Sequence, residues 1–178
     1  KVLLLLLLVA SCSHFSNEIV VAPLAPGQTR QGHEAKGQKY AIATQGEGAS
    51  QAGAKMFALG GNAIDAAVAI SFAISVERPQ STGIGGGGFM LVHGPGMEEP
   101  IAFDFREKAP LKAHSKMYLD SKGNVIDKKS LDGIFAVGVP GLVAGLVEVH
   151  RRFGLLELSE VVAPAIELAD KGFKIYPE

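Results

Sequence analysis

Hydrophobic and polar positions divide the chain into three parts. An unbroken apolar run covers residues 3–9 behind Lys1, and residues 13–39 are polar and contain several prolines and glycines. From residue 40 onward, apolar positions return with regular spacing. The pattern therefore predicts an N-terminal targeting segment over residues 1–12, a flexible linker over 13–39, and a folded body over 40–178.

Four segments of this body have the spacing or composition of α-helices. They cover residues 49–59, 63–76, 141–153 and 159–171. The second segment is apolar at nearly every position and rich in Ala, which indicates a helix buried on all sides. Asn62 precedes it with Asp65 three residues on, a relative of the capping box that favours a helix start.

Two of these helices should have a distinct buried face. In the segment 141–153 the expected inward positions are Leu142, Leu146, Val149 and Phe153. In the segment 159–171 they are Val162, Ala165, Ile166 and Ala169. Each set recurs at helical spacing, so each predicts one face packed against the core.

Three shorter apolar stretches, residues 40–44, 89–93 and 101–106, are typical of β-strands. The last two are joined by a turn around Gly94-Pro95-Gly96, which predicts a hairpin. Helices combined with a hairpin indicate an α+β body built in layers.

Composition and charge exclude several classes of function. The 178 residues include 17 basic and 18 acidic ones, for a net charge of −1, with no Trp and three Tyr. Without a basic surface or aromatic stacking platforms, nucleic acid is not expected as a partner. The single cysteine excludes a disulfide framework and a cysteine-rich zinc site.

The N-terminal segment has the pattern of an export signal. Its apolar run is far shorter than the roughly 20 residues of a membrane-spanning helix, and it ends in small residues. The sequence Val9-Ala10-Ser11-Cys12 resembles the lipobox of bacterial lipoproteins, in which the cysteine is lipidated. We expect an exported, periplasmic protein held at the membrane only through a lipid on Cys12; the alternative is an ordinary signal in which Cys12 is incidental.

The glycine-rich stretch 83–88 fits the dinucleotide-binding pattern G-x-G-x-x-G, and Asp104 lies at a suitable distance after it. That fingerprint must leave a strand and open a helix. Here the loop follows a predicted helix and enters a predicted strand. The favoured interpretation is therefore that these glycines allow tight turns and close packing.

No metal site, cofactor or catalytic nucleophile is expected from spacing alone. The histidines are scattered and none forms a helical pair with another: His14, His33, His93, His114 and His150. A G-x-S-x-G nucleophile elbow is absent from the sequence. No Ser or Thr can be assigned a catalytic base.

The stretch around Arg106 is the strongest candidate for ligand binding. On a strand, Phe103 and Phe105 face one side, and Asp104 and Arg106 face the other. The planar guanidinium of Arg106 suits a carboxylate through two parallel hydrogen bonds, and Asp104 could orient it. The alternative, favoured by spacing alone, is a solvated charge pair at a sheet edge.

Several motifs, in order along residues 40–178, resemble those of one family. The matching stretches are residues 60–69 (GGNAIDAAVA), 81–90 (STGIGGGGFM), 104–110 (DFREKAP), 137–141 (VGVPG) and 163–166 (APAI). The family is that of the γ-glutamyltranspeptidases, also called glutathione hydrolases.

The resemblance implies a fold and an activity. Its members are N-terminal nucleophile hydrolases with a four-layer α/β/β/α sandwich, of which this chain would contain only the N-terminal portion of the large subunit. The proenzyme cuts itself, and the new N-terminal Thr of the small subunit is the nucleophile. That Thr lies outside this segment, so no catalytic residue is expected here, and the segment alone should be inactive with one sheet face uncovered.

The resemblance also implies a substrate and a role for one residue. The γ-glutamyl group of compounds such as glutathione passes to water or to an amino-acid or peptide acceptor. The Arg of D-F-R-E, here Arg106, binds the α-carboxylate of that group, which reverses the preference for a solvated pair. Asp104 as its orienting partner remains an inference from the residues. Hydrolysis and transpeptidation stay open, as do two alternatives, a related acylase or amidohydrolase and a lipid-anchored binding protein without catalysis.

Overall fold

The computed structural model describes residues 37–175. The predicted signal segment (1–12) with Cys12, and the predicted linker up to residue 36, lie outside the described residues. The chain divides into two units, residues 1–42 and 43–178. Residues 37–42, the described part of the first unit, contain no helix or strand.

One predicted strand is wrong. Residues 40–44 have no strand assignment, because a strand needs the main chain of a neighbour to pair with. Among the described residues, the one strand ladder joins the two later strands to each other. An apolar stretch without such a neighbour stays irregular.

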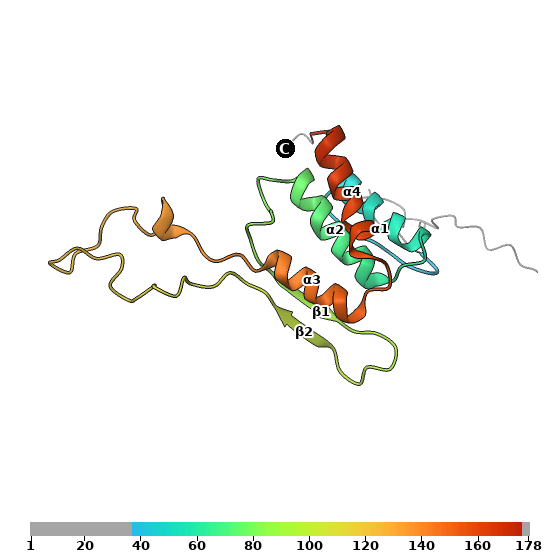
Figure 1. Cartoon of the computed structure of the whole chain (residues 1–178), viewed down its shortest axis with the longest axis horizontal. Coiled ribbons are helices and arrows are strands. Elements are labelled where there is room, and N and C mark those ends of the chain that lie inside the picture. The colour runs from blue at the N-terminus through green and yellow to red at the C-terminus, as the bar shows by residue number, and fades with distance from the viewer. Residues whose placement is uncertain (1–36, 176–178) are drawn as a thin grey trace, which may run out of the picture. The chain divides into compact units, whose positions relative to one another are not determined.

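The four predicted helices and the hairpin are confirmed, with ends within two residues of those expected. The helices are α1 (Glu47–Ala58), α2 (Ala63–Glu77), α3 (Leu142–Phe153) and α4 (Leu158–Lys171). The strands are β1 (Phe89–Val92) and β2 (Ile101–Asp104), and a short 3-10 helix covers Ile134–Ala136. The connection from β2 to α3 runs away from the helices, as Figure 1 shows in yellow and orange.

Helix α2 is the centre of the helical layer, as its all-round apolar pattern predicted. It packs against α1, α4 and α3, and Figure 1 shows α1 and α4 beside it. Ala66, Ala69 and Ala73 are buried on it, and their small side chains allow the neighbouring helices to approach closely. Within residues 37–175, no helix is both long and apolar enough to span a membrane.

The buried face predicted for α3 is confirmed, with Phe153 half-buried at its end. The face predicted for α4 is confirmed at Ala165 and wrong at Ile166 and Ala169. On α4 the buried residues are Val161, Pro164 and Ala165, whereas Ile166 is 62% exposed and Ala169 is exposed. Apolar residues occupy two adjacent faces of this helix at the same spacing. Contact with α1 and α2 decides which face is buried, and spacing alone does not.

The start of α2 is fixed by a complete capping box. Asn62 Oδ1 accepts hydrogen bonds from the main-chain N–H of Ile64 (2.8 Å) and Asp65 (3.1 Å). The Asp65 carboxylate in turn accepts from the main-chain N–H of Asn62 at 2.7 Å. The capping prediction is therefore confirmed.

The same carboxylate joins α2 to the connection between α3 and α4. Asp65 is fully buried and accepts main-chain hydrogen bonds from Leu155 (3.1 Å) and Leu156 (3.2 Å). His150 Nε2 lies 3.2 Å from Asp65 Oδ1, and Asn62 Nδ2 donates to the Phe153 carbonyl at 2.6 Å. A buried carboxylate is stable only with such partners.

A second buried carboxylate acts at the other end of α2. Glu77 is 5% exposed and accepts from the main-chain N–H groups of Gly48 and Ala49, each at 3.0 Å. These donors belong to the first turn of α1, where N–H groups have no partner within the helix. Helix α2 is thus bound to its neighbours at both ends.

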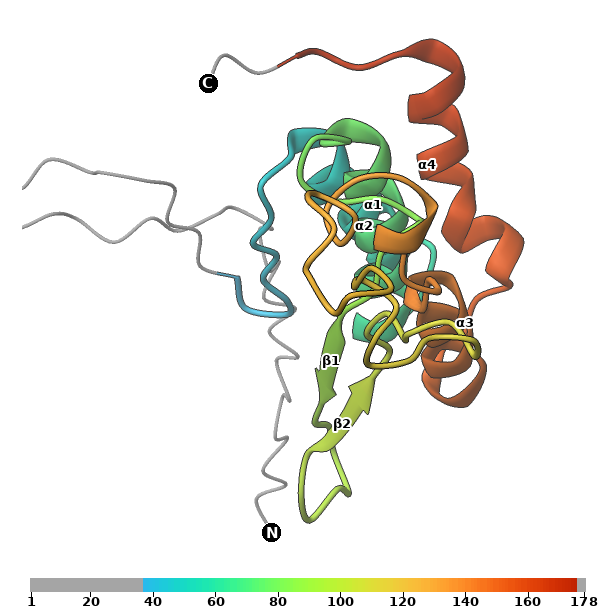
Figure 2. The same ribbon diagram turned by 90° about the vertical axis from the view of Figure 1, so that its left-hand side faces the viewer.

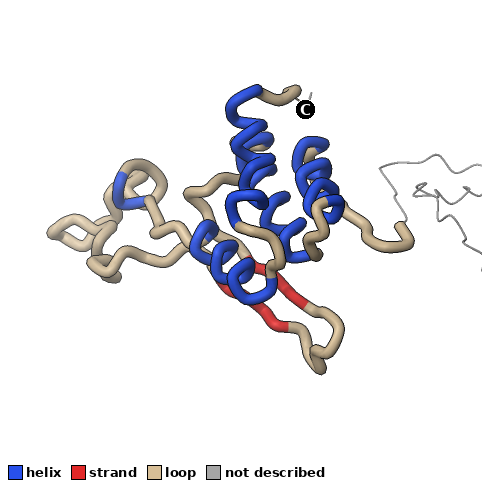
Figure 3. Tube along the Cα trace, turned by 45° about the vertical axis from the view of Figure 1, so that its right-hand side comes forward, coloured by secondary structure: helices blue, strands red, loops and turns tan. Residues whose placement is uncertain are grey.

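The hairpin lies against α3 (Figure 3, red). Its strands are antiparallel, with Phe89 opposite Asp104 and Met90 opposite Phe103. The Phe103 ring packs edge-on against Phe153 of α3, with ring centroids 6.1 Å apart. On the other face Phe89 and Leu91 are each 70% exposed, as expected for a sheet face without a covering layer among the described residues.

We predict that Asp65→Asn strongly destabilises the protein. In either orientation of the side-chain amide, an NH2 group would meet a main-chain N–H that now donates to the carboxylate. Loss of a buried, paired carboxylate lowers the free energy of unfolding by about 3–5 kcal/mol. Urea unfolding followed by circular dichroism measures the change.

Glu167→Gln is the matched control, because Glu167 is half-exposed and forms ion pairs only at the surface. Its unfolding midpoint should stay close to that of the unaltered protein. Equal unfolding midpoints for the two variants would contradict the assigned role of Asp65.

Candidate functional site

Arg106 is the second residue after β2, and 55% of its side chain is exposed. Its guanidinium Nη1 lies 3.2 Å from Glu107 Oε2. The expected partner Asp104 contacts the main chain instead, where its Oδ1 accepts from the Arg106 N–H at 3.0 Å. Among the described residues, Asp104 thus holds the Arg106 backbone and Glu107 holds its guanidinium.

The predicted alternation of side chains is confirmed up to Arg106. Phe105 is 9% exposed and belongs to the core, and Phe103 is half-buried against the same cluster. Asp104 and Arg106 are exposed on the other side. A cationic side chain is therefore accessible to a ligand while its immediate neighbour is anchored in the core.

The glycine-rich loop, residues 83–88, lies beside this segment. It does not lead into the start of a helix. It leaves α2 and enters β1, the reverse of the order that a dinucleotide-binding fingerprint requires. Gly88 and Phe105 exchange two main-chain hydrogen bonds, at 3.3 and 3.0 Å, and the Gly86 N–H donates to the Gly83 carbonyl at 3.0 Å. The loop thus continues the hairpin pairing one step beyond the strands.

A third segment, residues 138–142, leads into α3 and is hydrogen-bonded to both the glycine-rich loop and Lys108. The Gly86 carbonyl accepts from the N–H groups of Gly141 and Leu142, each at 3.0 Å. Lys108 and Val139 exchange hydrogen bonds at 3.1 and 2.8 Å. Residues 105–108 therefore lie between the glycine-rich loop and residues 138–142 (Figure 2 shows β1 and β2 side by side, below helices α1 and α2).

Two glycines, Gly87 and Gly141, leave no room for side chains beside this main chain; we call them the glycine clamp. A Cβ on Gly87 would lie 2.6 Å from the Phe105 carbonyl oxygen and 2.7 Å from the Glu107 nitrogen. A Cβ on Gly141 would overlap the Phe105 carbonyl. Real Cβ atoms do not approach main-chain atoms this closely, because packed interiors tolerate no such overlap.

Other glycines complete the enclosure. A Cβ on Gly145 would overlap the Phe105 ring, and one on Gly138 would lie 3.0 Å from Glu107 Cβ. By contrast, a Cβ on Gly85 would meet nothing within 4 Å. Only some glycines of the loop are therefore required by close approach.

The lowered carboxyl pKa values in the described residues belong to groups elsewhere. Hydrogen bonds from Arg151 and Arg152 lower the pKa of Glu148 to about 2. The main-chain N–H of Asn124 lowers the pKa of Asp120, and Lys171 lowers that of Glu167. No cluster of three His, Cys, Asp or Glu able to hold a metal occurs in residues 37–175.

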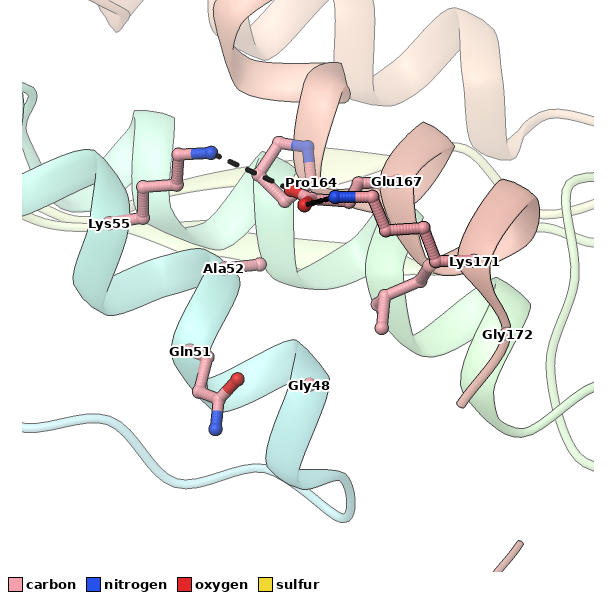
Figure 4. A pocket seen from close by; sticks show the side chains of 9 residues that line it. Gly48, Gln51, Ala52, Lys55, Pro164, Glu167, Lys171 and Gly172 are labelled. Carbon is pink, nitrogen blue, oxygen red and sulfur yellow. Dashed lines mark hydrogen bonds and ion pairs between the residues drawn. The ribbon is translucent and has the colours of Figure 1, made fainter. Parts of the chain in front are cut away.

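A groove of about 310 Å³ between α1 and α4 is a separate feature. Figure 4 shows Lys55 and Lys171 pointing toward Glu167 within it. Glu167 lies 3.9 Å from Lys55 Nζ and 2.6 Å from Lys171 Nζ. The charged side chains of the groove that Figure 4 draws, Lys55, Glu167 and Lys171, are therefore paired with one another. None of the predicted site residues lines the groove.

Sequence reasoning missed Glu107 and the glycine clamp. The alternation expected for residues 103–106 assigns no place to Glu107, which follows them. The adjacency of Arg106 and Glu107 in the motif was the available signal. No sequence pattern separates Gly87, which touches the main chain, from Gly85, which does not.

Comparison with known proteins identifies first the class and then the family. The fold resembles a solved γ-glutamyltranspeptidase from Pseudomonas nitroreducens complexed with L-DON: the TM-score is 0.72 at 46% identity, over 76% of this chain and 40% of that one. A cephalosporin acylase from Bacillus halodurans matches with a TM-score of 0.64 at 34% identity, over 72% of this chain and 23% of that one. These confirm the expected fold class, that of the N-terminal nucleophile hydrolases, of which this chain matches only a part.

The chain belongs to the γ-glutamyltranspeptidase family, whose sequence model matches residues 49–178. A curated relative, the glutathione hydrolase proenzyme of Pseudomonas aeruginosa, is 49% identical over 135 residues. That match covers 76% of this chain and 24% of the relative. The chain therefore spans about a quarter of the length of this relative.

We predict that Gly87→Ala destabilises the protein and that Gly85→Ala does not. The added methyl group at residue 87 overlaps the main chain of residues 105–107, and such overpacking costs about 1–3 kcal/mol. The same methyl group at residue 85 points into open space. Urea unfolding of both variants measures the difference; equal stability of the two would contradict the enclosure.

Proposed function

We propose that the protein is the N-terminal part of a glutathione hydrolase and γ-glutamyltransferase, and that Arg106 binds the α-carboxylate of the γ-glutamyl donor. The observation that carries this is an exposed guanidinium on a main chain that packs closely against Gly87 and Gly141. Membership of the γ-glutamyltranspeptidase family supports the choice of substrate. Glutathione and related γ-glutamyl amides carry the required carboxylate.

The geometry suits recognition of a carboxylate. Glu107 contacts Nη1 of Arg106, so Nη2 and Nε are available for a carboxylate in a bidentate pair. The Asp104 carboxylate accepts a hydrogen bond from the Arg106 main-chain N–H. This bond limits movement of the backbone from which the Arg106 side chain extends. In the proposed site, Glu107 and Asp104 are positioning residues and Arg106 touches the substrate.

The proposed chemistry depends on a Thr outside this segment. Its hydroxyl attacks the γ-carbonyl carbon, the C–N bond of the amide breaks, and the proton goes to the leaving amine. Water then hydrolyses the γ-glutamyl ester to glutamate, or the amine of an amino acid or peptide takes the group to form a new amide. We propose that self-cleavage of a precursor frees this Thr at the start of a small subunit; relatives named proenzymes support such processing.

We propose that the protein is exported and lipid-anchored in the periplasm. The support is the sequence of residues 1–12 alone: an apolar run behind Lys1 that ends in the lipobox-like Val9-Ala10-Ser11-Cys12. A single lipid chain binds membranes weakly, whereas two or more anchor stably.

A second candidate function is that of an acylase with a different acyl group. The structural likeness to a cephalosporin acylase favours it. Arg106 separates the two functions, because its guanidinium suits a donor with an α-carboxylate. A substrate without that group would gain nothing from Arg106.

We predict that Arg106→Gln in the full-length enzyme raises KM for a γ-glutamyl anilide with little change in kcat. Loss of one charged hydrogen bond costs about 1.5–3 kcal/mol, or roughly tenfold to a hundredfold in KM. The α-carboxamide analogue of the anilide should be a poor substrate for the unaltered enzyme, and equally poor for the variant.

Arg151→Gln is the matched control, since Arg151 is an exposed arginine of α3 that pairs with Glu148. It should leave KM unchanged. An unchanged KM in Arg106→Gln would remove Arg106 from the site. A preference of the unaltered enzyme for the carboxamide would favour the acylase function.

We predict that Cys12→Ser abolishes lipid labelling and releases the protein from the membrane fraction of bacterial cells, because a serine hydroxyl cannot form the thioether to the lipid. Incorporation of labelled palmitate measures the change, and Ser13→Ala serves as the control. Undiminished labelling in Cys12→Ser would contradict the proposed anchor.

A further inference from the structure

We propose that Gly141, acting with Gly87, is a positioning residue for substrate binding: the glycine clamp sets where the Arg106 guanidinium meets the donor carboxylate. This inference rests on the proposed function of Arg106. It concerns residues that touch no substrate and act only through the main chain of their neighbour.

The clamp contacts the peptide units on both sides of Arg106. A Cβ on Gly87 would lie 2.9 Å from the Arg106 carbonyl carbon and 2.7 Å from the Glu107 nitrogen. A Cβ on Gly141 would lie 3.0 Å from the Arg106 carbonyl oxygen and closer still to the Phe105 carbonyl. Neither glycine has a positive φ, so close approach, and not an unusual backbone conformation, is what requires glycine here.

The two halves of the clamp are joined to each other. The Gly86 carbonyl accepts from the N–H groups of Gly141 and Leu142 at 3.0 Å. Gly88 pairs with Phe105 in both directions. A shift of the Arg106 main chain away from either glycine would therefore strain or break these hydrogen bonds, because the same hydrogen-bonded segments carry both glycines.

A fixed main chain matters because a bidentate pair depends on alignment. A guanidinium gains its two parallel hydrogen bonds only when both N–H groups meet both carboxylate oxygens. A displaced Arg106 backbone would misalign them in ground state and transition state alike. Such a loss of uniform binding raises KM and leaves kcat nearly unchanged.

The test is a double-mutant cycle in the full-length enzyme, with γ-glutamyl anilide as the probe. Gly141→Ala should raise KM roughly tenfold or more, as expected when a charged hydrogen bond is lost. In an Arg106→Gln background, the same substitution should have almost no further effect on KM. Gly85→Ala, outside the clamp, should leave KM at its original value.

A merely structural role gives a different result. It would lower the amount of active enzyme, and so the apparent kcat, while KM stays unchanged, or it would raise KM equally in both backgrounds; either outcome overturns the proposal. If Gly141→Ala does not fold, Gly87→Ala takes its place, because its Cβ would lie 2.6 Å from the Phe105 carbonyl oxygen and 2.7 Å from the Glu107 nitrogen. An unchanged KM in that variant overturns the proposal, and a raised KM that vanishes without Arg106 supports it.

The same measurements distinguish a failure of the function proposed for Arg106 from a failure of the role proposed for the glycine clamp. If the unaltered enzyme did not turn over the anilide, or if Arg106→Gln did not change KM, the function of Arg106 would be wrong. If Arg106→Gln raised KM and Gly141→Ala did not, the function would stand and the clamp alone would be wrong.

Discussion

The lack of space beside the main chain of residues 105–107 is the constraint on which the site depends. Gly87 and Gly141 lie against this main chain from two segments that are far apart in sequence. Because neither can carry a side chain, the three segments come together with main-chain hydrogen bonds between them. The consequence is an arginine whose backbone is held in the interior and whose guanidinium is exposed.

The helical layer provides what this arrangement needs. Asp65 binds the start of α2 to the connection between α3 and α4, and Glu77 binds the end of α2 to the start of α1. Helix α3 carries Gly141 at its start and Gly145 in its second turn, and Phe105 packs against both. Buried carboxylates with main-chain partners thus fix the helices, and α3 in turn fixes the segment that leads to Arg106.

Much of this could be predicted from the sequence, since periodicity gave the helices, the hairpin and the alternation of Phe103, Asp104 and Phe105. What failed depended on contacts between distant segments. The strand expected at residues 40–44 has no strand partner among the described residues, and α4 buries Val161 where spacing allowed Val162. The partner of the Arg106 guanidinium is Glu107 and not Asp104, whose carboxylate accepts from the Arg106 main-chain N–H instead.

The most direct test of the account is a crystal structure of the full-length protein with glutamate bound. We expect the α-carboxylate of glutamate at hydrogen-bond distance from the Arg106 guanidinium, in a bidentate pair, with residues 105–107 still enclosed by Gly87 and Gly141. A glutamate whose α-carboxylate is bound by other residues, with Arg106 turned to solvent, would contradict it.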